Sequence, residues 1–210
     1  MNNIDPIAVA VSFGVLLLSL TIHEAAHAWT ADKLGDPTAR TLGRVSLNPL
    51  VHIDWIGTVL LPIVAIISNL PLIGWAKPVP VMLRNLRHPR RDFMIVAAAG
   101  PISNILQAVV YAIVLQFVTT STDAEAPGLL AQALRLAVFI NLLLAFFNLI
   151  PVPPLDGGNV LLGLLPPRLA AMYDQTRQFG FIILYALMLS GAASAIIYPP
   201  TLFMMRILIP

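Results

Sequence analysis

The chain has 210 residues, of which 58% are hydrophobic and only 10% are charged. An ordinary soluble domain carries about 25% charged residues, so this composition excludes a normal water-exposed surface and predicts a membrane protein. There is no cysteine, which excludes disulfides, thiolate metal sites and cysteine nucleophiles. The net charge of +2 comes from clustered Lys and Arg, with no basic face of the kind that binds nucleic acid.

Apolar runs long enough to cross the hydrocarbon core recur along the chain, and each needs about 18 residues or more. No Lys or Arg precedes position 33, so we expect the first run to be a retained helix and not a signal peptide. The tail from Thr201 is too short to span. We therefore predict an all-α polytopic membrane protein, a single membrane-embedded domain over residues 1–210, with about five transmembrane helices near residues 6–30, 54–73, 94–120, 129–150 and 179–198.

Basic residues favour the cytoplasmic side of a membrane, and here they gather in the connectors 32–52, 74–93 and 152–178. The connector 121–128 contains acidic residues and no basic one. This pattern predicts a cytoplasmic location for the three basic connectors. It places the N-terminus and the 121–128 connector outside.

The run 54–73 does not fit this topology as a single crossing, because basic connectors flank it on both sides. A simple crossing would leave one of them outside. We expect this segment to enter as a helix and residues 69–80, rich in Pro and Gly, to return as a re-entrant extended strand. Such backbone is tolerated at membrane depth only where protein or a water-filled cavity covers it.

A metal-binding motif lies in the first run, where the sequence reads His23-Glu24-Ala25-Ala26-His27. On a helix the two histidines are one turn apart and can reach one Zn²⁺. Glu24 can take a proton from a water molecule that the metal acidifies and deliver it to the leaving amine. Random placement would give this pattern in about one chain in a thousand of this composition. Such polar groups are costly in a bilayer without a metal or a proton path.

A catalytic zinc needs a third protein ligand, and Asp156 is the favoured candidate. Prolines before it end the fourth apolar run, and glycines after it permit a tight backbone. Since Asp156 and His27 both lie at cytoplasmic helix ends, we expect them at similar depth. The alternative is an ordinary Asp-Gly turn. His52 and Asp54 lie near the same side. The alternatives for them are a contact to a metal ligand and the capping of a loop or helix start, and capping is favoured.

Three motifs occur in order on apolar segments, and together they resemble the site-2 protease family of intramembrane zinc metalloproteases, peptidase family M50, in a small form without PDZ or CBS domains. They are the His23 to His27 motif, Gly100-Pro101-Ile102-Ser103-Asn104, and Phe147-Asn148-Leu149-Ile150-Pro151-Val152-Pro153-Pro154-Leu155-Asp156-Gly157. The segment Gly74-Trp75-Ala76-Lys77-Pro78-Val79-Pro80 resembles the family's re-entrant segment, which presents a strand edge to an unwound substrate.

The resemblance implies that His23, His27 and Asp156 bind one Zn²⁺ per chain and that Glu24 is the catalytic base. It also implies that Asn104 and Asn148 handle the substrate or stabilise the reacting carbonyl, with hydrogen bonding between helices as the alternative. Asn141, seven residues before Asn148 on the same helix face, is not part of the motif and stays outside the predicted site.

The predicted function is an endopeptidase that cuts transmembrane segments of other proteins. Its expected partners are those substrates and the lipid bilayer, and no nucleic acid. We expect the protein in a prokaryotic plasma membrane, with its active site toward the cytoplasm. One alternative is an intramembrane metal or proton transporter, although the chain lacks two related halves. Another is a metal-binding scaffold without activity, against which the intact Glu24 argues.

Overall fold

The computed structural model describes residues 6–60, 77–120 and 128–209, and over these ranges the chain is helical and contains no strand. The long helices are α1, α4 and α5, and the remaining elements are shorter helices and single 3-10 or π-helical turns. In chain order they are α1 (Pro6–Lys33), α2 (Thr38–Thr41), η1 (Pro49–Val51), η2 (Trp55–Leu60), η3 (Leu83–Asn85), α4 (Pro89–Thr120), α5 (Leu129–Asn148), α6 (Asp156–Leu164), α7 (Pro167–Asp174), η4 (Gln175–Phe179), α8 (Gly180–Leu189) and α9 (Ala192–Leu208).

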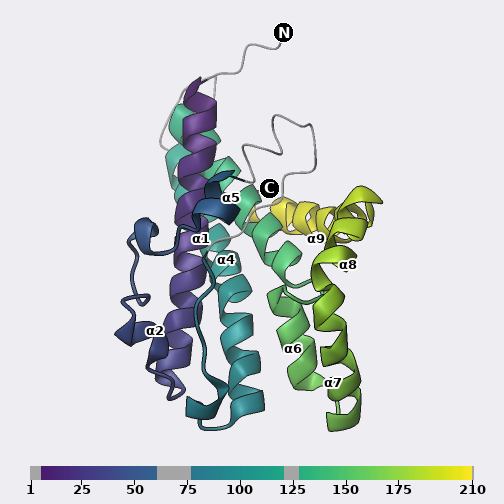
Figure 1. Ribbon diagram of the computed structural model, residues 1–210. Helices are drawn as coiled ribbons and strands as arrows, with labels where there is room; N and C mark the ends of the chain where they lie inside the picture. The colour runs from purple at the N-terminus through teal and green to yellow at the C-terminus, as the bar shows by residue number, and fades with distance from the viewer. Residues whose placement is uncertain (1–5, 61–76, 121–127, 210) are drawn as a thin grey trace.

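Helices α1, α4 and α5 are long and apolar enough to cross a membrane, and they pack against one another. Helix α1 ends and α4 begins at the same end of the bundle, so the two run antiparallel (Figure 1). Small residues, among them Ala108 and Ala112 of α4, are buried against Val138 and Leu142 of α5 and allow a close approach. The predicted all-α membrane fold is confirmed.

The predicted run 179–198 is not one continuous helix, and the tail from Thr201 belongs to the second of its two parts. Helix α8 ends at Leu189, and Gly191 has a φ of +77°, a left-handed conformation that glycine adopts without strain. Helix α9 then continues through Thr201 to Leu208, and the segments before and after the break are bent by 73° (Figure 1).

The described residues thus hold three candidate crossings, or four if the bent pair 167–189 and 192–208 forms one. The connector predicted for 152–178 contains α6, α7 and η4. Of the predicted run 54–73, residues 61–73 lie outside the described residues, as do residues 69–76 of the re-entrant segment.

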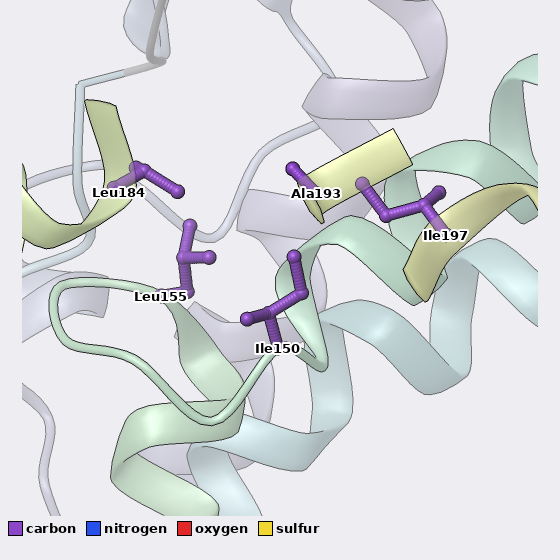
Figure 2. Packing of buried hydrophobic residues seen from close by; sticks show 5 residues of the cluster. All are labelled: Ile150, Leu155, Leu184, Ala193 and Ile197. Carbon is purple, nitrogen blue, oxygen red and sulfur yellow. The ribbon is translucent and has the colours of Figure 1, made fainter. Parts of the chain in front are cut away.

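A second core holds the turn after α5 in place. Figure 2 shows Ile150 and Leu155 of this turn beside Leu184 of α8 and Ala193 and Ile197 of α9, and all five side chains are buried. Burial of such side chains contributes roughly 25 cal/mol per Å² of apolar area. The turn that carries the predicted zinc ligand Asp156 is therefore anchored on helices from the C-terminal part of the chain.

A buried carboxylate joins the two basic connectors, 32–52 and 74–93. Asp36 is fully buried and accepts hydrogen bonds from the backbone N–H of Met82 at 2.6 Å and from Asn85 Nδ2 at 2.9 Å. Burial alone would raise the pKa of Asp36, but the hydrogen bonds to its carboxylate outweigh this effect and hold the pKa below its usual value. Asp36 is therefore charged at neutral pH, and the two connectors lie side by side.

Candidate metal centre

The structure brings together the three residues predicted as metal ligands. His23 and His27 lie one turn apart on α1, with their Nε2 atoms 3.0 Å from each other. Asp156 Oδ2, at the start of α6, lies 3.1 Å from His23 Nε2 and 3.3 Å from His27 Nε2. Residues far apart in the sequence thus place three ligand atoms around one point.

The hydrogen bonds on the far side of each ring show which atoms face this point. His27 Nδ1 lies 2.7 Å from the Val96 carbonyl oxygen, which can only accept, so Nδ1 donates. His23 Nδ1 donates in the same way to Asn104 Oδ1 at 2.6 Å. Both Nε2 atoms therefore direct lone pairs at Asp156 Oδ2, a buried oxygen that receives no hydrogen bond from the described residues. A cation bound between these atoms would relieve their repulsion.

The space between the ligand atoms fits zinc. Ligands at 2.0–2.2 Å in tetrahedral geometry lie about 3.3 Å from one another, close to the separations found here. Gly100 of α4 faces the same point. A Cβ at this position would lie 2.3 Å from His27 Nε2 and 2.5 Å from His23 Nε2, so the glycine leaves open the space that a metal needs. The donor atoms, their spacing and the free volume all suit one Zn²⁺.

Asp156 is positioned by close contact between α6 and the turn before it. A Cβ on Gly157 would lie 2.2 Å from the Leu149 carbonyl oxygen, and one on Gly158 would lie 2.7 Å from Pro153 N. No larger residue fits at either place without a shift of backbone. The carboxylate also lies in the first turn of α6, where the helix dipole favours negative charge. The predicted tight backbone after Asp156 thus belongs to a helix start and not to an isolated Asp-Gly turn.

The same turn is held from its other side by α7 and α8. Gly180 begins α8, and a Cβ there would lie 2.1 Å from the Pro153 carbonyl oxygen. The Tyr173 hydroxyl of α7 donates to the Pro151 carbonyl oxygen at 3.0 Å. These contacts fix the path of the proline-rich segment, and with it the direction in which Asp156 points.

Glu24 follows the first ligand on α1 and is half-buried. No sequence motif connects Arg44 with it. The Arg44 side chain is buried and donates through Nη2 to the Lys77 carbonyl oxygen. Burial lowers the pKa of Arg44, and the negative charge of Glu24 only partly offsets this effect. Through the Lys77 carbonyl, Arg44 holds the described end of the predicted re-entrant segment.

The remaining sequence-predicted residues occupy distinct places. Asp54 Oδ1 accepts from the backbone N–H groups of Ile56 at 3.0 Å and Gly57 at 2.7 Å, so the predicted capping of a helix start is confirmed. His52 has a loop role: its Nε2 bonds to the Ser46 carbonyl oxygen at 2.9 Å. Its own carbonyl oxygen accepts from the Lys77 N–H at 2.8 Å.

The two asparagines of the motifs differ in exposure. Asn104 is fully buried, with its oxygen bound to His23. Asn148 is half-buried at the end of α5, and its Nδ2 donates to the Leu144 carbonyl oxygen of the same helix at 3.0 Å. The substrate-handling role of both residues stays a prediction.

A helical membrane protein with two histidines one turn apart, a converging aspartate and an adjacent glutamate has the donor set of a zinc hydrolase. Comparison with known proteins agrees with this class. A family model described as peptidase family M50 matches residues 118–191. The protein of Bacillus subtilis (strain 168) named "Putative zinc metalloprotease YwhC" is 37% identical over 188 residues, which cover 88% of this chain and 82% of that protein.

Two further relatives are longer than this chain. "Putative zinc metalloprotease Rip2" of Mycolicibacterium smegmatis is 30% identical over 177 residues, or 84% of this chain and 65% of that protein. "Zinc metalloprotease MJ0392" of Methanocaldococcus jannaschii is 32% identical over 170 residues, or 80% of this chain and 38% of that protein. No solved structure matches the chain. The chain belongs to peptidase family M50 and is a zinc metalloprotease.

Proposed function

We propose that this metalloprotease is an intramembrane endopeptidase, which hydrolyses peptide bonds within or near the transmembrane segments of other membrane proteins. His23, His27 and Asp156 hold the zinc ion, and Glu24 is the catalytic base. The observation that carries the proposal is the convergence of three ligand atoms between a long apolar helix, α1, and the start of α6. The site lies within the helical bundle, not on an appended soluble domain.

The roles of the chain's own groups follow from this placement. A bound Zn²⁺ supplies Lewis acidity for the scissile carbonyl and acidifies the attacking water. The Glu24 carboxylate accepts the proton of that water and delivers it to the leaving amine. Asp156 is the most exposed of the three ligands, with 16% of its side chain accessible against 4% for His23 and 10% for His27. Substrate and water therefore approach from the side of Asp156.

The described end of the re-entrant segment supports a role in holding the substrate. Residues 77–82 are not helical, and the backbone of Lys77 is fixed on both sides by His52 and Arg44. A peptide bond inside a helix is shielded by its own hydrogen bonds, so the substrate must unwind before it is cut. A non-helical segment whose backbone is held in place can offer an edge beside which an unwound strand binds. Pro78 and Pro80 lack N–H groups and limit this pairing to alternate positions.

The orientation that we propose places the basic connectors and the metal site toward the cytoplasm of a prokaryotic plasma membrane, with the N-terminus outside. The positive-inside rule supports this orientation. The hydrogen bonds of Asp36 to Met82 and Asn85 support it too, because they hold together two connectors that a simple crossing of 54–73 would separate.

The proposal is tested with the full chain purified in detergent, by measuring bound zinc and the cleavage of a panel of single-span membrane proteins. We expect about one zinc per chain in both the wild type and Glu24→Gln, with cleavage by the wild type alone. Asp174→Asn, which removes an exposed carboxylate paired with Arg177, is the matched control and should cleave normally. Equal cleavage by Glu24→Gln would contradict the role of Glu24 as the catalytic base. No cleavage by the wild type would contradict intramembrane proteolysis and favour a transporter or a scaffold.

A further inference from the structure

A chain of buried amides runs from α5 to the metal centre. Asn104 of α4 and Asn141 of α5 are both fully buried. Asn104 Oδ1 accepts from His23 Nδ1 at 2.6 Å, and Asn104 Nδ2 donates to Asn141 Oδ1 at 2.9 Å. Asn141 Nδ2 donates to the Ala137 carbonyl oxygen and to Ser19 Oγ, each at 2.9 Å. Three helices thus contribute to one continuous set of hydrogen bonds.

The direction of these hydrogen bonds is fixed at the end remote from the metal. The Ala137 carbonyl can only accept, so the side chain of Asn141 must direct its NH₂ group toward it and its oxygen toward Asn104. Asn104 must therefore donate from its own NH₂ group to the Asn141 oxygen, and this turns the Asn104 oxygen toward His23. His23 Nδ1 is then required to donate, and its Nε2 carries the lone pair.

The two histidines differ in how this state is secured. His27 donates to the Val96 carbonyl, a backbone group that cannot turn over. The partner of His23 is a side-chain amide. If this amide turned by half a rotation, its NH₂ group would face His23 Nδ1, and the ring would have to adopt the tautomer that carries its proton on Nε2. Asn141 is the residue that blocks this rotation, because a turned Asn104 would direct its oxygen at the oxygen of Asn141.

We propose that Asn104 and Asn141 are positioning residues, which hold His23 in the tautomer and orientation that bind zinc through Nε2. Asn141 thereby connects α5 to the metal centre, although it lies outside the motifs of the sequence. The proposal rests on the ligand role of His23 in the proposed function. Hydrogen bonds to the far nitrogen of a metal-binding histidine are worth about 10- to 100-fold in metal affinity.

The test measures zinc affinity by competition with a chelator, together with the visible absorption of the Co²⁺-substituted protein. We expect Asn104→Leu and Asn141→Leu each to weaken zinc binding by about 10- to 100-fold and to change the Co²⁺ spectrum. Gln107→Leu is the matched control. Gln107 is a buried amide on α4, one turn beyond Asn104, and its polar atoms have no hydrogen-bond partner among the described residues. It should bind zinc as the wild type does.

A second pair of variants separates positioning from a general loss of structure. Asn104→Asp presents only acceptors to His23, so it cannot turn a donor toward the ring, although its second oxygen then faces Asn141 Oδ1. It should bind zinc more tightly than Asn104→Leu does. In this background Asn141→Leu should not weaken zinc binding further, because there is no rotation left to block and the two facing oxygens are gone. If Asn141→Leu does not fold, Asn141→Ala takes its place in both backgrounds.

Wild-type zinc affinity in Asn141→Leu, or an equal loss in both backgrounds, would overturn the positioning role. His23→Ala separates this failure from that of the proposed function. Tight zinc binding by His23→Ala would overturn the ligand assignment and the positioning role with it. Loss of zinc from His23→Ala with no effect of Asn141→Leu would overturn the positioning role alone.

Discussion

At the scale of single residues, the metal centre depends as much on a missing side chain as on those that are present. Gly100 faces the two ligand histidines from α4, and the place of its absent Cβ is 2.3–2.5 Å from both Nε2 atoms. An added methyl group would occupy the space between the ligands. It would force apart α1 and α4, at a typical cost of about 1–3 kcal/mol for an overpacked core.

Gly100→Ala should therefore bind less zinc and lose cleavage, which metal analysis and the cleavage assay measure on the same sample. Gly14→Ala is the control, since Gly14 lies on α1 and a Cβ there meets nothing within 4 Å. It should retain both properties, with a melting temperature equal to or above that of the wild type because alanine favours a helix. Full zinc content in Gly100→Ala would show that the space is not needed.

The cluster of His23, His27 and Asp156 could be expected from the sequence because two histidines and a glutamate at helical spacing have few uses inside a bilayer. Gly100, Asn141 and Arg44 could not be assigned in the same way. Their contribution is a shape or a hydrogen bond to a residue on another element, and it exists only once the helices are packed. Asn141 was left outside the predicted site for this reason.

At the scale of elements, the connectors decide how the helices enter the membrane. Asp36 ties the connector after α1 to the residues that precede α4, and the Arg87 N–H donates to the Leu34 carbonyl oxygen at 3.2 Å. The chain between α1 and α4 therefore leaves and returns at one end of the bundle (Figure 1). This is the arrangement that the parity of basic connectors predicts.

The absence of cysteine makes this arrangement directly testable with single-cysteine variants. Leu47→Cys and Leu83→Cys change exposed side chains in the two connectors, and Leu129→Cys changes an exposed side chain at the start of α5. With a membrane-impermeant thiol reagent, we expect Leu47→Cys and Leu83→Cys to react from the cytoplasmic side and Leu129→Cys from the outside. Reaction of Leu47→Cys and Leu83→Cys from opposite sides would contradict the re-entrant path.

The helix boundaries agree with the apolar runs of the sequence in some places and differ in others. The runs at 6–30, 94–120 and 129–150 are continuous helices because one apolar stretch with few breaks forms each of them. The run at 179–198 is equally apolar, yet Gly191 and the packing of Ala193 and Ile197 on the turn after α5 divide it. Hydropathy reflects the free energy of transferring side chains into lipid, and it carries no information about where the backbone changes direction.

At the scale of the whole molecule, the metal centre exists only in the assembled bundle. In the proposed site, helix α1 supplies His23, His27 and Glu24, and α6 supplies Asp156. Helix α4 supplies Gly100 and Asn104, and α5 supplies Asn141. The turn that positions Asp156 is in turn held by α7, α8 and α9. A site built from so many elements inside apolar helices suits a substrate that arrives through the membrane.

The most direct test of this account is the mass of the products formed from a single-span membrane protein. Wild-type enzyme should yield fragments whose new ends lie within or at the border of the apolar span, and Glu24→Gln should yield none. New ends confined to the soluble flanks of the substrate, or the same fragments from Glu24→Gln, would contradict intramembrane cleavage by this metal centre.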